Sequence, residues 1–212
     1  MEEQIISNIK IEKDLKSTKN EDKKNSLLNK LLKENESKNI NKGLKDDGFI
    51  ENISEQTNSK NYTSLTNTSN DCKTVRILKQ LASGLHSEFT DTARYSFQHL
   101  ITKMSNPALS NDLELISIVE MKHLELLGSA IISFGGVPKY TGANGNFWSA
   151  KFVDYNTDIN TFLKRNILAE EKAIQIYSKA IDMVSNQSLK KLLEEIIQDE
   201  KEHIVIFNSY LK

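Results

Sequence analysis

Residues 120–123 read Glu-Met-Lys-His and residues 200–203 read Glu-Lys-Glu-His, so one Glu-x-x-His pattern occurs twice. In a helix, side chains three positions apart lie on the same face. Each copy follows a single glutamate, Glu88 or Glu170, at a similar distance along the chain. Four carboxylates and two imidazoles on four helices are the ligand set of a carboxylate-bridged pair of metal ions.

Apolar residues recur at steps of three and four from Val75 onward, which is the period of an amphipathic helix. The first helix is expected at about residues 75–104, and the second begins after Asn106-Pro107, a cap followed by proline at the first helical position. Gly135-Gly136 should end the second helix. The stripe of the first helix contains Leu81, Leu85, Glu88, Tyr95 and His99.

Two further helices are expected to begin near residues 156–158 and 186–188. Short loops within each pair predict two antiparallel hairpins, and the stretch from Gly135 to Tyr155 is long enough to cross between them. The sequence therefore predicts an all-α fold, a ferritin-like four-helix bundle with a long crossover between its second and third helices. A carboxylate on an apolar stripe is costly unless it is partnered, so the alternatives to a metal site are a set of buried salt bridges or a misassigned stripe.

Composition argues against several classes of protein. A net charge of −1 gives no basic field for nucleic acid, and no apolar run approaches the length of a membrane span. The first ten residues lack the pattern of a signal peptide, and Cys72 is the single cysteine, so no internal disulfide can form. We expect a cytoplasmic protein that binds neither nucleic acid nor membrane.

Residues 1–72 differ from the rest of the chain. They are rich in Lys, Asn, Glu, Ser and Asp, and Phe49 and Tyr62 are their only aromatic residues. Such a stretch buries too little apolar surface to offset the entropy of ordering. We expect a disordered, low-complexity tail at residues 1–72, with a docking arm as the less favoured alternative, and the bundle at residues 73–212.

Two tyrosines repeat with the glutamates, because Tyr95 follows Glu88 by seven residues and Tyr177 follows Glu170 by seven. Seven residues are about two helical turns, so each tyrosine shares a face with its glutamate. Each hydroxyl either orients a bridging carboxylate through a hydrogen bond or reaches any convenient acceptor in the core.

The segment from Glu120 to Pro138 resembles the corresponding helix and turn of bacterioferritins, and residues 166–207 resemble the second half of bacterioferritins and rubrerythrins. The resemblance implies a di-iron centre in which Glu120 and Glu200 bridge the metals and each histidine binds one of them. Its six ligands would be Glu88, Glu120, His123, Glu170, Glu200 and His203.

The chain departs from these families at several positions. With Cys72 as its only cysteine it lacks the rubredoxin domain of rubrerythrins, and Ala173 stands where rubrerythrins have an extra glutamate. Met121 occupies the position of the haem-ligating methionine of bacterioferritins, but methionine more often serves packing, and we do not expect haem.

The expected function is that of an iron-binding oxidoreductase, a ferroxidase or a peroxide-reducing enzyme with two Fe ions per chain. Its partners would be O2 or H2O2, an unknown electron donor, and further copies of the chain in a homodimer or higher oligomer. Carboxylate and imidazole ligands separate iron from manganese poorly. A manganese catalase-like enzyme with two Mn ions and a non-enzymatic structural or coat protein are therefore the alternatives.

Overall fold

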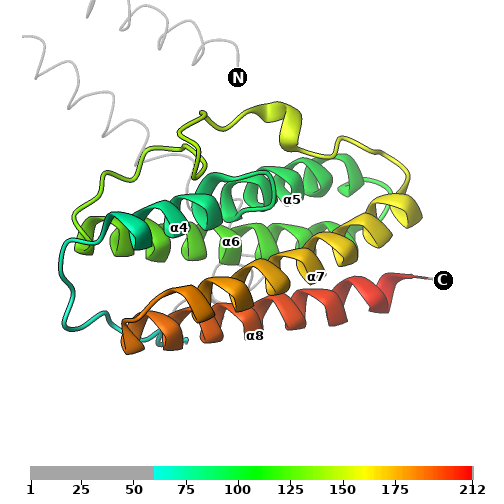
Figure 1. Ribbon diagram of the computed structural model, residues 1–212. Helices are drawn as coiled ribbons and strands as arrows, with labels where there is room; N and C mark the ends of the chain where they lie inside the picture. Colours follow the sequence, from blue (N-terminus) through cyan, green and yellow to red (C-terminus); the bar gives the residue numbers. More distant parts are fainter. Residues whose placement is uncertain (1–59, 212) are drawn as a thin grey trace, which may run out of the picture. The chain divides into compact units, whose positions relative to one another are not determined.

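The computed structural model describes residues 60–211, and these residues are helical with no strand beyond one isolated bridge between Thr141 and Phe147. The helices are α4 (Cys72–Ser83), α5 (Glu88–Thr102), α6 (Pro107–Ser133), α7 (Ile159–Met183) and α8 (Gln187–Tyr210). The first rod of the bundle consists of α4 and α5, and α6, α7 and α8 are the other three. In the bundle α5 packs against α6 and α7 packs against α8 (Figure 1). The predicted all-α, ferritin-like four-helix bundle is confirmed. A short 3₁₀ turn, η1 (Ala150–Phe152), lies in the connection between α6 and α7.

The first rod is not the continuous helix that the sequence predicted for residues 75–104. It breaks between α4 and α5, and Leu85, assigned to the buried stripe, is 50% exposed. At the break Ser87 Oγ donates to the Gly84 carbonyl (2.8 Å) and caps α5 by accepting from the Thr90 amide. Serine competes in this way with helical backbone bonds. The break makes Glu88 the first residue of α5, where the helix dipole favours a carboxylate.

The remaining helix ends lie close to the predicted positions. Asn106 caps α6 through Leu109 N, with Pro107 at the first helical position, and Gly135 follows the helix with a φ of 80°. Asp158 caps α7 and Asn186 caps α8, each through a side-chain oxygen. The chain between α6 and α7 crosses the bundle (Figure 1), as the long interval between the two hairpins predicted.

The buried apolar residues form two clusters, and on every rod the site residues lie between them in sequence. On α6, for example, Leu113 and Ile116 belong to one cluster and Leu127 to the other, with Glu120 and His123 in between. The site is thus a polar layer between two apolar layers, which limits the access of bulk water to it.

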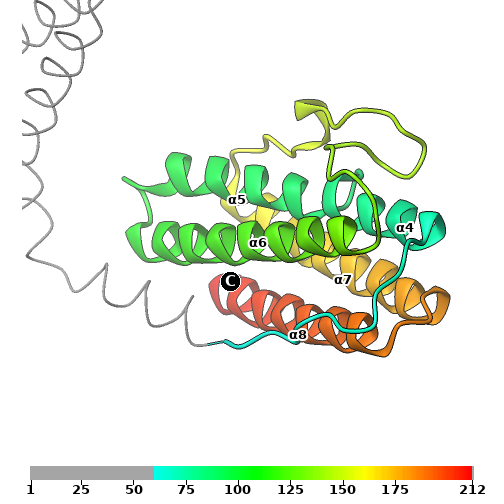
Figure 2. The same cartoon turned by 90° about the vertical axis from the view of Figure 1, so that its left-hand side faces the viewer.

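Residues 60–71, which the sequence assigned to the tail, lie along α8 before they enter α4 (Figure 2). Thr63 donates to the Glu195 carboxylate from its amide and its hydroxyl (both 2.7 Å), and Thr66 N donates to Ser188 Oγ (2.9 Å). The bundle therefore includes an extended strap before the expected boundary at residue 73. Residues 1–59 of the predicted tail lie outside the described residues.

None of the helices in residues 60–211 combines the length and the apolar character that crossing a membrane would require.

Candidate metal centre

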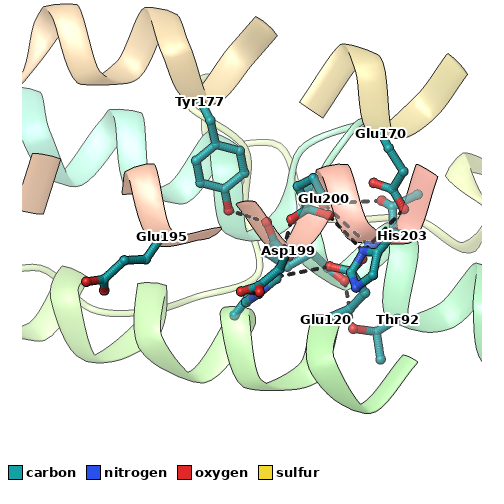
Figure 3. A network of polar contacts seen from close by, with 12 residues as sticks. Thr92, Glu120, Glu170, Tyr177, Glu195, Asp199, Glu200 and His203 are labelled. Carbon is teal, nitrogen blue, oxygen red and sulfur yellow. Dashed lines mark hydrogen bonds and ion pairs between the residues drawn. The ribbon is translucent and has the colours of Figure 1, made fainter. Parts of the chain in front are cut away.

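The bundle brings all six predicted ligands together in its buried layer. Figure 3 labels four of them, Glu120, Glu170, Glu200 and His203. The six form two overlapping groups, and within each group the candidate ligand atoms lie within 4.8 Å of one another. Glu120 and Glu200 belong to both groups, while each histidine belongs to one. One group is Glu88, Glu120, His123 and Glu200, and the other is Glu120, Glu170, Glu200 and His203.

Both imidazoles turn Nδ1 toward the carboxylates. His123 Nδ1 lies 3.2 Å from Glu88 Oε2 and 3.3 Å from an oxygen of each shared glutamate. His203 Nδ1 lies 3.0 Å from Glu200 Oε2 and 3.1 Å from Glu120 Oε1. A ring nitrogen carries at most one proton and can donate it to one acceptor only. Each Nδ1 here faces several carboxylate oxygens, and one nitrogen with several oxygens suits a metal cation better than a single hydrogen bond.

The buried oxygens provide a further test of the fit to metal ions. Within residues 60–211, Glu120 Oε1, Glu170 Oε2 and Glu200 Oε1 are buried and accept no hydrogen bond, although a histidine Nδ1 lies 3.1 Å from the first oxygen and 3.3 Å from the third. Buried oxygens of this kind are costly unless a cation neutralises them. The formal charge of the four glutamates equals that of two divalent cations with opposite sign. Donor types, arrangement and charge all fit a pair of metal ions.

The pKa values follow the same electrostatics. Burial raises the pKa of Glu120 well above its ordinary value and that of Glu170 to about 7. Burial acts in the same direction on Glu200, but the two neighbouring histidines outweigh it and lower the pKa of that carboxyl. Burial opposes a charge on His123 and His203, yet the surrounding carboxylates raise the pKa of both imidazoles. The layer thus favours positive charge among its carboxylates.

The family is shown by sequence, because residues 79–211 match the family model described as Rubrerythrin. The chain belongs to the rubrerythrin family. That match covers every residue of the two candidate metal groups. No curated protein sequence matches the chain.

Solved structures with a similar fold bind metals of more than one kind. KatB, a manganese catalase from Anabaena PCC7120, is 22% identical, with a TM-score of 0.65 over 69% of this chain and 74% of that one. The bacterioferritin BfrA of Mycobacterium tuberculosis is 21% identical, with a TM-score of 0.57 over 67% and 86%. The bacterioferritin of Desulfovibrio desulfuricans, which has a diiron site, is 22% identical, with a TM-score of 0.56 over 65% and 77%. At these identities the likeness shows the fold alone.

The two repeated tyrosines of this rubrerythrin-family chain bond crosswise. The Tyr95 hydroxyl donates to Glu170, and the Tyr177 hydroxyl donates to Glu88. Each tyrosine therefore donates to a candidate metal ligand, as expected, but the acceptors are the two glutamates that belong to one group each, and each acceptor lies on the opposite hairpin. Each tyrosine ties one hairpin to the other at the level of the site.

Sequence reasoning missed Asp199, whose Oδ2 lies 3.1 Å from His123 Nε2. Asp199 is 6% exposed and lies at the edge of the α8 stripe, three residues after Ile196 and four before His203. That spacing was a usable signal, but the carboxylate is part of an acidic run that suggests a solvent-facing side chain. The same carboxylate forms an ion pair with Lys60.

A second buried pair lies on α5, where Arg94 Nη1 is 2.5 Å from Asp91 Oδ1. Burial raises the pKa of Asp91, and the glutamates of the site add to the effect. Asp91 lies one turn after Glu88, the position that Ala173 occupies after Glu170. An extra acidic residue is thus present, in the first hairpin rather than the second, but it belongs to neither candidate metal group. Met121, considered above as a haem ligand, is 54% exposed.

Proposed function

We propose that the chain binds two metal ions through the six residues and uses them in an oxidoreductase reaction with O2 or H2O2. The observation that carries this proposal is the overlap of the two groups, since Glu120 and Glu200 belong to both. Two carboxylates shared between two histidine-containing groups are the arrangement that bridged metal pairs require.

Iron is the metal that we propose, because buried carboxylate oxygens and imidazoles suit iron or manganese and the family is that of rubrerythrin. A pair of Fe(II) ions would supply two electrons together, as many as the reduction of one H2O2 to two waters consumes. The described residues perform the remaining tasks. His123 and His203 would each bind one of the two metal ions, and the flanking apolar clusters restrict the access of bulk water to the site. An external electron donor would return the electrons.

A manganese catalase-like activity is the second candidate, supported by the fold that the chain shares with KatB. The two candidates differ in the source of electrons. A catalase draws them from a second H2O2 and releases O2, whereas a peroxide-reducing enzyme needs a separate donor.

The test begins with metal analysis of the purified chain, for which we expect about two metal ions per chain. Fe(II) added without oxygen and then exposed to O2 or H2O2 should be oxidised faster than in buffer. Replacing His123 or His203 by alanine should slow that oxidation. Glu202→Gln, an exposed neighbour on α8, is the matched control and should behave as the wild type.

Two results would redirect the proposal. Rapid O2 release from H2O2 by manganese-loaded protein, with inert iron-loaded protein, would favour the catalase. Histidine variants that lose thermal stability while oxidation proceeds at the wild-type rate would leave only a structural role for the metal.

A further inference from the structure

We propose that Tyr62 positions the metal ligand His123 through Asp199, and that this contact makes the two metal positions unequal in affinity. The inference rests on the proposed two-metal function and deepens it. Tyr62 lies on the strap, outside the residues 79–211 that match the family model. The contact is therefore a property of this chain that its family match does not include.

The geometry around His123 Nε2 supports this role. The Tyr62 hydroxyl donates to Asp199 Oδ2 (2.8 Å), and its oxygen lies 3.3 Å from His123 Nε2. The two rings meet edge to face with centroids 6.0 Å apart. Because the carboxylate that faces Nε2 also accepts from Tyr62 and pairs with Lys60, it is held from the side of the strap.

This contact determines which nitrogen of His123 faces the metal. An imidazole that binds a cation through Nδ1 carries its proton on Nε2, and that proton needs an acceptor. Asp199 Oδ2, 3.1 Å away, is the acceptor. Fixing the acceptor fixes the tautomer and the ring orientation, and a hydrogen-bonded carboxylate also makes the imidazole a stronger donor to the metal.

The other metal position lacks this support. Asp199 directly precedes Glu200, but the residue that precedes Glu120 in the other motif is Val119, which has no polar side-chain atom. Among residues 60–211, no hydrogen bond reaches His203 Nε2, whereas His123 Nε2 has two neighbours within 3.3 Å. The ion bound by His123 should therefore be the tighter of the two.

The strap is anchored well enough to place Tyr62. On either side of the contact, Thr63 is held by Glu195 and Lys60 by Asp199. Glu195 and Asp199 are four residues apart on α8, so they lie on one face of that helix, as Figure 3 shows. Tyr62 therefore reaches the site from between two strap residues, Lys60 and Thr63, that are bonded to α8.

The test is a calorimetric titration of the full-length, metal-free chain with Mn(II) alone, under conditions where the metal stays reduced. The wild type should show two steps of different affinity. Tyr62→Phe, which removes only the hydroxyl, should weaken the tighter step about 10-fold, and Asp199→Asn should weaken it by up to about 100-fold. The weaker step should remain unchanged in both variants.

Tyr210→Phe is the matched control, because it removes a hydroxyl that donates to Asp112 Oδ2 (2.6 Å) away from the site. It should leave both steps unchanged. Proton NMR of the Co(II)-loaded protein supplies an independent signature. One of the two shifted imidazole N–H signals should move or broaden in Tyr62→Phe, and neither should change in Tyr210→Phe.

Two equal steps in the wild type would overturn the inference while leaving the proposed function intact. A Tyr62→Phe variant that changes neither step, or weakens both by the same factor, would overturn it as well. A wild-type chain that binds no Mn(II) or Fe(II) at all would instead contradict the proposed function. Far-UV circular dichroism of each metal-free variant separates these results from loss of the fold.

Discussion

At the scale of single residues, the site distinguishes shared from unshared glutamates. Glu120 is 1% exposed and belongs to both candidate groups, whereas Glu88 is 2% exposed and belongs to one. Their burial is the same, so a difference between their variants would report the number of metal ions that each contacts. The neighbouring polar contacts differ too, because the Tyr177 hydroxyl donates to Glu88.

Glu120→Gln should therefore lower the binding of both metal ions, because a neutral amide cannot replace a bridging carboxylate. Glu88→Gln should weaken one ion and leave the other close to its wild-type affinity. Metal stoichiometry after dialysis against a fixed free-metal concentration measures both. Equal loss in the two variants would contradict the assignment of Glu120 as the shared ligand.

At the scale of elements, the break between α4 and α5 places Glu88 at a helix start. A Cβ at Gly84 would lie 2.6 Å from the Gln80 carbonyl oxygen, so alanine cannot enter without a shift of backbone. We expect Ser87→Ala to cost about 1 kcal/mol of unfolding free energy through loss of the cap. Gly84→Ala should cost more and also weaken metal binding. Urea unfolding with and without metal measures both, with the exposed Ser178→Ala on α7 as control.

The cap of α4 gives a pH dependence with a defined sign. Hydrogen bonds from Thr74 and Lys73 lower the pKa of Asp71 below 3.8. A group with a lowered folded-state pKa contributes stability above its unfolded pKa and loses that contribution as the pH falls through the folded pKa. The stability advantage of wild type over Asp71→Asn should be constant near neutral pH and shrink below pH 3.8. Urea unfolding at several pH values would show it, and an advantage that grows in acid would contradict it.

At the scale of the whole molecule, the strap predicts different stabilities for two truncated forms of the chain. Removing residues 1–59 should leave the melting temperature and the metal content unchanged. Removing residues 1–71 also deletes the contacts of Tyr62 and Thr63 and the cap of α4. We expect the second truncation to lose roughly 2–4 kcal/mol of stability, from one cap and a few hydrogen bonds. Thermal unfolding of both proteins checks this, and equal melting temperatures would show that the strap contributes nothing.

The sequence by itself determined the all-helical class, the crossover between the two hairpins, and the fact that the two Glu-x-x-His motifs lie together in the core. The reason is that each depends on local rules, since a period of 3.6 places Glu120 and His123 on one face and caps such as Asn106 define helix starts. The apolar stripe then requires those faces to turn inward together.

Only the tertiary structure decided the contacts between distant segments. The bond from Tyr177 to Glu88 and that from Tyr62 to Asp199 join residues 89 and 137 positions apart. No local pattern encodes such a partner, because it depends on how whole helices pack. The break before Glu88 was missed for a related reason, since the helical period of α4 and α5 continues across a turn that Ser87 and Gly84 stabilise. Packing selects that turn over the straight helix that periodicity favours.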